Sequence, residues 1–461
     1  MGWFPFARRG AARRDFVLSL EGVGHSFLTR HLPEGAFPAL AALFGDGDLR
    51  PLPAALPPVS PAVWATYLTG CAPGRHGVWG RVERRPGSYE LFRPTSSDVS
   101  VPTLLESLSR AGRTAVAVNV PGTYPPRPIR GVLVAAGRGL PLDALCYPAR
   151  IGALLRGLGY RDDVDAGPAL DGNAEDLMAD LERSLRKRFE VAFALLHREP
   201  WDFFQLHVSE TDRLNHAFWE DYELDAPGRG RAFLSFYRLL DGLAGELLAL
   251  LPPGVEIVLL SGHGFRRLRR EIALNRCLEE LGWLEFADPR LRRLPGIGPE
   301  SRAYSLAPGR VYLHLKGREP RGRIAGREEY RGFREGLAAD LLRLRDPDGG
   351  APVVARVIPG EEIAGRPEWG PFPIAVSERQ PAPCDLLVVP AEGYGFRGGF
   401  DHTTVATRSE MTGAHAYDDA FLFVRGRRIR ARAPRLVDVG PTILDLMAAR
   451  AAERPDGVSL V

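Results

Sequence analysis

Ser60 stands in the segment PPVSPAVWATYLTG, where it is followed by Pro61 and then by residues with helical spacing. A serine directly before a proline is typical of a helix N-cap with proline at the first helical position. A hydroxyl there lies at the positive end of the helix, beside backbone N–H groups that suit a phosphate or sulfate. The residues alone therefore leave two roles open for Ser60, a plain helix cap or a group beside a bound anion.

Four other residues have the chemistry of metal ligands. In TDRLNH, Asp212 and His216 are four residues apart, so on a helix both face the same way with the oxygen and nitrogen donors that a zinc-like ion prefers. His263 directly follows the apolar run VEIVLLSG, at the edge where open α/β sheets bind ligands. His415 lies in a loop, TGAHA, before another predicted strand. Taken alone, the Asp212–His216 pair and His415 are more often structural than metal-binding, and a histidine at the place of His263 is as often structural.

Short apolar runs bounded by turn formers recur along the chain and predict the strands that position these residues. Their continuous hydrophobicity indicates burial on both faces, as in a parallel sheet covered by helices. Segments with helical spacing lie between them, at 101–112, 174–197 and 233–251. The alternation predicts an α/β fold with a central, mostly parallel sheet between helices. The predicted strands are residues 15–20, 114–120, 203–208, 255–261, 385–389 and 420–424.

The stretch 266–381 has a different character from the rest of the chain. It is rich in Arg, Gly and Pro, and RVYLHL around Tyr312 is its strongest strand signal. We expect a smaller lobe here, inserted into the α/β domain and covering the site like a cap. Residues 1–14 are expected to form a flexible N-terminus, and residues 15–461 a single α/β domain that carries the lobe.

Composition excludes several classes of protein. The 461 residues carry a formal net charge of +3, and the basic runs lack interleaved aromatic residues, so no nucleic-acid partner is expected. No apolar run is long enough to span a bilayer, and the N-terminus has no apolar core of a secretory signal. The four cysteines are far apart in sequence, which fits a reducing compartment, and we expect a cytoplasmic protein. No motif in the sequence predicts an oligomeric state.

In this order along the chain, the pieces described above resemble the alkaline phosphatase superfamily, in particular its type I phosphodiesterase and nucleotide pyrophosphatase branch. The resemblance covers nearly the whole chain, and residues 57–77 are its most specific part. It implies an alkaline-phosphatase-like fold with an inserted lobe. It also implies a phosphohydrolase of the phosphodiesterase type, which acts on a small phosphorylated substrate through a phospho-enzyme intermediate.

The same resemblance implies a centre of two metal ions, usually zinc, with Ser60 at the position of the nucleophile. The residues at the ligand positions are Asp212, His216 and His415 for the first ion, and Glu21 and His263 for the second. One ion would activate the hydroxyl and the other would stabilise the leaving oxygen. Arg81 and Asn119 are candidates for binding the substrate, Arg81 because the family often places a polar group there.

The sequence departs from the family pattern at the second ion only. The Asp-Gly of the family is Glu21-Gly22 here, and its Ser-Asp-His-Gly is Ser261-Gly262-His263-Gly264, so one carboxylate ligand is absent. Losing a charged ligand weakens a divalent site. We therefore predict one Zn²⁺, with other divalent metals also compatible, and a weakened second site.

These departures leave three interpretations open. The chain is an active phosphodiesterase or phosphomonoesterase with an altered, single-metal centre, or a catalytically inactive relative that acts as a ligand-binding or regulatory protein. In the third interpretation the metal residues are vestigial in a plain globular α/β protein.

Overall fold

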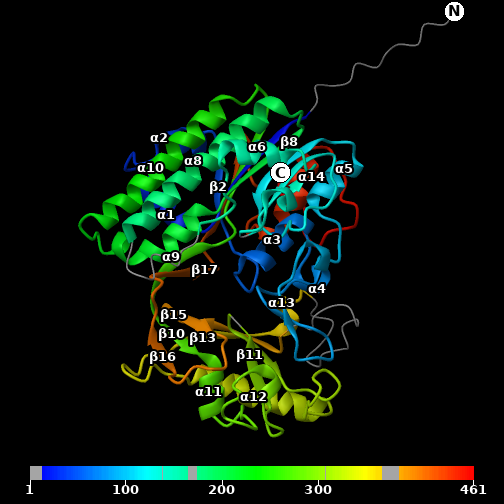
Figure 1. The fold of residues 1–461 in the computed structure, drawn as a ribbon, viewed down its shortest axis with the longest axis vertical. Helices are drawn as coiled ribbons and strands as arrows, with labels where there is room; N and C mark the ends of the chain where they lie inside the picture. The colour runs from blue at the N-terminus through cyan, green and yellow to red at the C-terminus, as the bar shows by residue number, and fades with distance from the viewer. Residues whose placement is uncertain (1–12, 138, 165–173, 307, 366–383) are drawn as a thin grey trace, which may run out of the picture.

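The computed structural model describes residues 13–137, 139–164, 174–306, 308–365 and 384–461. The predicted flexible N-terminus falls outside these ranges except for its last two residues. A central sheet of eight strands runs through the upper part of the molecule, and a smaller lobe lies below it (Figure 1). In order across the sheet the strands are β2 (Gly47–Leu52), β18 (Ala420–Arg425), β9 (Glu256–Leu260), β1 (Asp15–Leu20), β8 (Phe203–Val208), β5 (Ala115–Val120), β6 (Gly131–Ala135) and β7 (Cys146–Tyr147).

The middle of this sheet is parallel, and its edges are not. Strands β9, β1, β8, β5 and β6 pair in parallel, whereas β18 and β7 run antiparallel to their neighbours. Alternate side chains of β1 enter different cores, Phe16 and Leu18 on one face and Val17 on the other. This two-sided burial explains why the strand sequence is apolar without alternation. The predicted α/β fold is confirmed.

Helices cover both faces of the sheet (Figure 1). The face that receives Phe16 and Leu18 packs against α1 (His25–His31), α2 (Pro38–Phe44), α6 (Ile151–Leu158), α8 (Ala174–Arg198), α9 (Glu210–Glu223) and α10 (Arg229–Ala249). The opposite face packs against α3 (Ser60–Thr69), α5 (Leu104–Arg110) and α14 (Leu436–Leu446), with the short helix α4 (Pro73–His76) after α3. The three helical segments predicted from spacing correspond to α5, α8 and α10. Within the described ranges, no helix combines the length and apolar character that crossing a membrane requires.

The lobe has its own hydrophobic core, which Trp79 of the α/β domain joins. It contains two small sheets, one in the order β11-β12-β14-β13 and one built around β10. A hairpin of β3 (Glu83–Arg84) and β4 (Leu91–Phe92) and three short 3-10 helices (Ser96–Asp98, Leu142–Leu145, Leu294–Gly296) complete the described elements. The lobe elements are β10 (Gly264–Ala273), α11 (Leu274–Glu280), β11 (Ala303–Leu306), β12 (Arg310–Leu313), α12 (Arg327–Leu342), β13 (Val354–Pro359), α13 (Gly360–Ile363), β14 (Leu386–Pro390), β15 (Gly393–Arg397), β16 (Ala406–Arg408) and β17 (Gly413–Ala416).

The apolar run 385–389 belongs to this lobe and not to the central sheet. It forms β14, which pairs antiparallel with β12 and β13, and β15 and β16 then pair with β10. The lobe therefore continues past residue 381, where the composition suggested its end. A short buried strand has the same apolar pattern in either kind of sheet, so the sequence could not distinguish the two.

Candidate active site

The candidate site lies at the carboxyl edge of the central sheet, where β1, β8 and β9 end. Glu21 follows β1, and His263 stands between β9 and β10. Asp212 and His216 lie on α9, which begins two residues after β8. His415 was predicted in a loop but lies in β17, where it pairs with Phe265 of β10. That pairing brings a residue from the end of the chain to this edge.

We call Asp212, His216 and His415 the cation cluster. Asp212 Oδ1 lies 3.2 Å from His415 Nε2 and 3.7 Å from His216 Nε2, and the two imidazole Nε2 atoms are 3.1 Å apart. His216 Nδ1 donates to the carbonyl of Gly413 at 2.8 Å and His415 Nδ1 to that of Pro58 at 2.6 Å. Because Nδ1 carries the proton in both rings, both Nε2 atoms present lone pairs.

Three lone-pair atoms thus converge without a donor between them. Asp212 Oδ1 is buried, and no described residue gives it a hydrogen bond of regular geometry. Its other oxygen accepts from Arg213 at 2.5 Å. One carboxylate oxygen and two imidazole nitrogens within reach of one another are the donor set of a divalent cation, so the residues fit a bound metal ion.

Electrostatics prepare the same three side chains for a cation. Burial lowers the pKa of His216 to about 3. Burial, together with the neighbouring His263, also lowers the pKa of His415, so both imidazoles are neutral near pH 7. Burial opposes ionisation of Asp212, but the positive charge that His216 and His415 carry when protonated, with that of Arg213, outweighs it and holds the pKa of that carboxyl well below its usual range.

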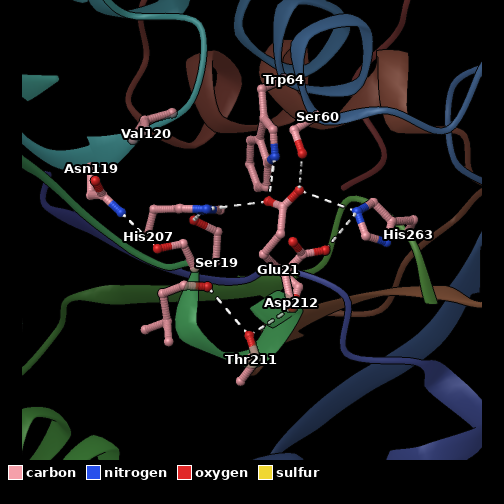
Figure 2. Close-up of polar contacts among 12 residues, drawn as sticks. Ser19, Glu21, Ser60, Trp64, Asn119, Val120, His207, Thr211, Asp212 and His263 are labelled. Carbon is pink, nitrogen blue, oxygen red and sulfur yellow. Dashed lines mark hydrogen bonds and ion pairs between the residues drawn. The ribbon is translucent and has the colours of Figure 1, made fainter. Parts of the chain in front are cut away.

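We call Glu21 and its partners the carboxylate cluster (Figure 2). Glu21 Oε1 accepts from Ser60 Oγ at 2.8 Å and lies 3.2 Å from His263 Nε2. Glu21 Oε2 accepts from Trp64 Nε1 at 2.5 Å and lies 3.2 Å from His207 Nε2. Burial would raise the pKa of Glu21, but the contacts with His207 and His263 reverse this and hold the pKa below its usual range.

Ser60 does not act as a helix cap. Helix α3 begins at Ser60 with Val59 at the N-cap position, and no side chain caps it. The Ser60 hydroxyl instead donates to Glu21 across the site. Of the two roles that the sequence left open, the plain cap is wrong, because Ser60 is the first residue of α3 and its hydroxyl donates to Glu21 instead.

The space beside Gly262 is already filled. A Cβ at this position would lie 2.6 Å from Val63 Cγ1 and 3.5 Å from the Trp64 ring. Val63 and Trp64 are both fully buried in α3. A second possible ligand group, Glu21, Asp212 and His263, shares Asp212 with the cation cluster and gains nothing from residue 262. The packing thus agrees with the sequence that no carboxylate reaches the site from here.

A cavity of about 750 Å³ opens beside the cation cluster, between the α/β domain and the lobe. His216 and His415 line it together with Arg81, while the lobe contributes apolar side chains such as Leu387 and Phe396. Arg81 lines this cavity, and its assignment to substrate binding stays a prediction. Its positive charge also contributes to the lowered pKa of His415.

Asn119 lies at the same sheet edge but faces elsewhere. It is the last but one residue of β5 and has a positive φ of 62°, and its side-chain N–H donates to Ser209 Oγ at 3.2 Å (Figure 2). The side chain is buried and makes this contact rather than one to Ser60 or Glu21. Its assignment to substrate binding stays a prediction.

His207, Trp64 and Arg213 are parts of the site that the sequence analysis did not assign. His207 and Trp64 hold Glu21, and Arg213 holds Asp212 and pairs with Asp163. A signal for His207 was present, because it interrupts the apolar run FFQLHV inside a strand that is buried throughout. A buried polar side chain in such a strand requires a partner.

Comparisons with known proteins agree with this architecture. The family model described as type I phosphodiesterase / nucleotide pyrophosphatase matches residues 16–418. The chain belongs to this family, which is one of phosphohydrolases. The comparison with curated proteins found no match.

Solved structures share the fold at low sequence identity. Phosphonoacetate hydrolase from Sinorhizobium meliloti 1021, in complex with phosphonoformate, is 18% identical with a TM-score of 0.63 over 95% of this chain and 96% of that one. Murine ectonucleotide pyrophosphatase / phosphodiesterase 5 is 15% identical with a TM-score of 0.57 over 96% and 97%. A variant of the alkaline phosphatase PafA is 13% identical with a TM-score of 0.61 over 97% and 99%. The fold is that of the alkaline phosphatase superfamily.

Proposed function

We propose that this protein is a metal-dependent phosphohydrolase of the phosphodiesterase type, with Ser60 as its nucleophile. One observation carries the proposal: the Ser60 hydroxyl is hydrogen-bonded to a buried carboxylate at the edge where Asp212, His216 and His415 converge. A serine outside its helix cap, beside a cation site and an open cavity, is placed to attack a phosphorus atom.

The residues divide the work as follows. Asp212, His216 and His415 would hold a divalent cation such as Zn²⁺, which when bound supplies positive charge to the phosphoryl oxygens. Arg81 lines the cavity next to two of these ligands and binds a phosphate oxygen. The remainder of a small phosphorylated substrate lies in the cavity against the lobe.

Ser60 attacks in line with the leaving oxygen. The bond between Ser60 Oγ and phosphorus forms as the bond to the leaving oxygen breaks. The Ser60 O–H bond breaks and its proton is released to solvent, while the leaving oxygen departs with the electron pair and takes up a proton from solvent. Hydrolysis of the resulting phosphoserine by water releases phosphate or a phosphomonoester and restores the hydroxyl.

The test uses a nitrophenyl phosphodiester and the matching monoester with zinc-loaded protein. We expect turnover of at least one substrate, acid-stable phosphate on Ser60 during turnover, and loss of both in Ser60→Ala. Ser107, a buried serine on α5, gives the matched control Ser107→Ala, which is expected to keep both signals.

A second candidate function is favoured by the filled space beside Gly262. In it the chain is a catalytically inactive relative that binds a phosphorylated ligand. Folded, zinc-loaded protein that binds vanadate but hydrolyses neither ester would support this candidate and contradict the first.

A further inference from the structure

The segment 79–83, which we call the Arg81 loop, follows α4 and ends in β3. Arg81, in its middle, lines the cavity beside the cation cluster. The residues at the two ends of the loop, Trp79 and Glu83, are fully buried. Because buried polar groups require hydrogen-bond partners, the partners of these end residues determine the path of the loop, and with it the place of Arg81.

Glu83 closes the loop from within. Its Oε1 accepts a hydrogen bond from the backbone N–H of Trp79 at 3.0 Å, so a side chain at one end of the loop binds the main chain at the other. A carboxylate buried to this degree is costly unless a positive charge or further donors compensate for it. The second oxygen of Glu83 therefore calls for a cationic partner.

That partner is Arg310 of β12, a fully buried residue of the lobe. Its Nη1 donates to Glu83 Oε2 at 2.9 Å, and its Nη2 donates to the backbone carbonyl of Val82. The same guanidinium lies against Gly80, where an added Cβ would be 2.7 Å from Nη2. Arg310 thus contacts the loop on both sides of Arg81.

We infer that Arg310, a residue of the lobe, positions Arg81 to bind the phosphoryl group of the substrate. The inference rests on the proposed function. Arg310 is not among the described residues that line the cavity, so it acts through the loop and not on the substrate itself. The lobe then takes part in phosphate binding in addition to forming one wall of the cavity.

The contacts require an arginine at position 310. A guanidinium presents separate nitrogens in a fixed fork, so that it can bind the Glu83 carboxylate and the Val82 carbonyl at once. A lysine has the same charge on one nitrogen. Arg310→Lys therefore keeps the countercharge for Glu83 but is expected to release one of the two acceptors, which loosens the loop around Arg81.

A second ion pair joins the same hairpin to the lobe and provides a matched control. Arg84 Nη2 lies 3.1 Å from Glu319 Oε1, and both side chains are buried. Arg84 Nη1 donates to the carbonyl of Ser88 at 2.7 Å, beyond the hairpin strand and away from the Arg81 loop. Arg84→Lys thus weakens a buried ion pair of the same kind without touching the contacts on either side of Arg81.

Vanadate binding to the zinc-loaded full chain, measured by titration calorimetry, tests the inference. Arg81→Ala removes a charge-assisted contact and is expected to raise the Kd for vanadate about 10–100-fold. Arg310→Lys is expected to raise it about tenfold, because such a contact weakens steeply when its geometry is lost. Arg84→Lys should leave the Kd unchanged, although both lysine variants should lower the thermal unfolding midpoint.

Combining the variants separates positioning from a general effect on stability. In protein that already carries Arg81→Ala, Arg310→Lys is expected to have no further effect on the Kd, because the residue through which it acts is gone. An equal effect of Arg310→Lys with and without Arg81 would overturn the inference. An unchanged Kd in folded Arg310→Lys would overturn it as well.

Gly80→Ala approaches the same contact from the loop, and it decides the question if Arg310→Lys does not fold. The added methyl group displaces the guanidinium and leaves every charge in place. We expect a higher Kd for vanadate that again depends on the presence of Arg81. A Kd equal to that of the unmodified protein would contradict the inference.

The two proposals fail in different ways. Protein that binds vanadate with the expected dependence on Arg310 but hydrolyses neither ester contradicts the proposed function and leaves the positioning role intact. Ester hydrolysis together with a vanadate Kd that does not respond to Arg310→Lys contradicts the positioning role and leaves the proposed function intact.

Discussion

The cation cluster and the carboxylate cluster lie side by side at one sheet edge and have opposite chemistry. In the cation cluster, lone pairs of Asp212, His216 and His415 converge, and two backbone carbonyls fix the imidazole protons on the outer side. In the carboxylate cluster, Ser60 and Trp64 donate hydrogen bonds to Glu21. In the first cluster three acceptor atoms face one another, and in the second Glu21 accepts hydrogen bonds from two donors.

The difference shows two ways in which a buried carboxylate is accommodated at the same sheet edge. Burying a carboxylate is costly unless cations or donors compensate for its charge. Here the hydrogen bonds from Ser60 and Trp64 compensate the charge of Glu21, whereas Asp212 has Arg213 on one oxygen and no regular hydrogen bond from a described residue on the other.

The largest effect is expected from a variant that tests whether the cation cluster binds metal. Asp212→Asn removes the only carboxylate of the cation cluster, so we expect loss of bound zinc and a fall in kcat/KM of about 10³-fold, equivalent to about 4 kcal/mol. Zinc content and ester hydrolysis are the measurements. Glu223→Gln, an exposed carboxylate on the same helix, is the control and should retain both. If Asp212→Asn binds as much zinc as the unmodified protein, Asp212 is not a metal ligand, and the proposed difference between the two clusters is wrong.

A smaller effect concerns the packing that closes the second position. Gly262→Asp forces a Cβ to 2.6 Å from Val63 Cγ1, and we expect it to lower the free energy of unfolding by about 1–3 kcal/mol. Adding Val63→Ala should relieve the contact, which gives a coupling energy of about 1 kcal/mol in a double-mutant cycle measured by urea unfolding.

The control for this cycle is Gly242→Asp, on an exposed part of α10 where a Cβ meets nothing within 4 Å. It should couple to Val63→Ala by no more than the error of the measurement. Additive effects of Gly262→Asp and Val63→Ala would mean that Val63 is not what excludes a side chain there.

A third carboxyl group sharpens the comparison, because Asp15 at the start of β1 is buried without a hydrogen-bond donor from any described residue. Neither of its side-chain oxygens has a hydrogen-bond partner among the described residues. Burial, and the negative charge of Glu256 beside it on the neighbouring strand β9, raise the pKa of Asp15 to about 8. The unfolded chain ionises this group near pH 4, so folding takes up a proton between pH 4 and 8.

Stability should therefore fall as pH rises through this window, by about 1.4 kcal/mol per pH unit from this group, and the loss should be complete above pH 8. Asp15→Asn should remove that slope. The free energy of unfolding of the variant should therefore rise relative to that of the unmodified protein as pH increases from 5 to 8. Urea unfolding at three pH values measures it. The exposed Asp225→Asn should keep the original slope, and identical slopes in all three proteins would show that Asp15 is ionised in the fold.

Much of this arrangement was predictable from the sequence because its signals are local. Asp212 and His216 share a helix face at a spacing of four, and His263 follows a buried strand, so the spacing itself brought them to one edge. The family pattern supplied Glu21 and the missing carboxylate at residue 262. The strands from residues 15, 114, 203, 255 and 420 were recognisable because burial on both faces leaves a continuous apolar run.

What the sequence did not show depends on contacts between distant segments. The roles of His207 and Trp64 follow from meeting Glu21, which is far from both in sequence. The filled space beside Gly262 depends on how α3 packs, and no local pattern encodes it. The strand that carries His415 is defined only by its pairing with β10.

That pairing has a consequence for the making of the protein. His415 reaches the cation cluster on β17, 199 residues after His216. Because synthesis proceeds from the N-terminus, α9 and its two ligands emerge from the ribosome well before the third ligand exists. The cation cluster is therefore completed only after the whole lobe has been made, and a chain that stops short of β17 lacks one of its three side chains however well its sheet has formed.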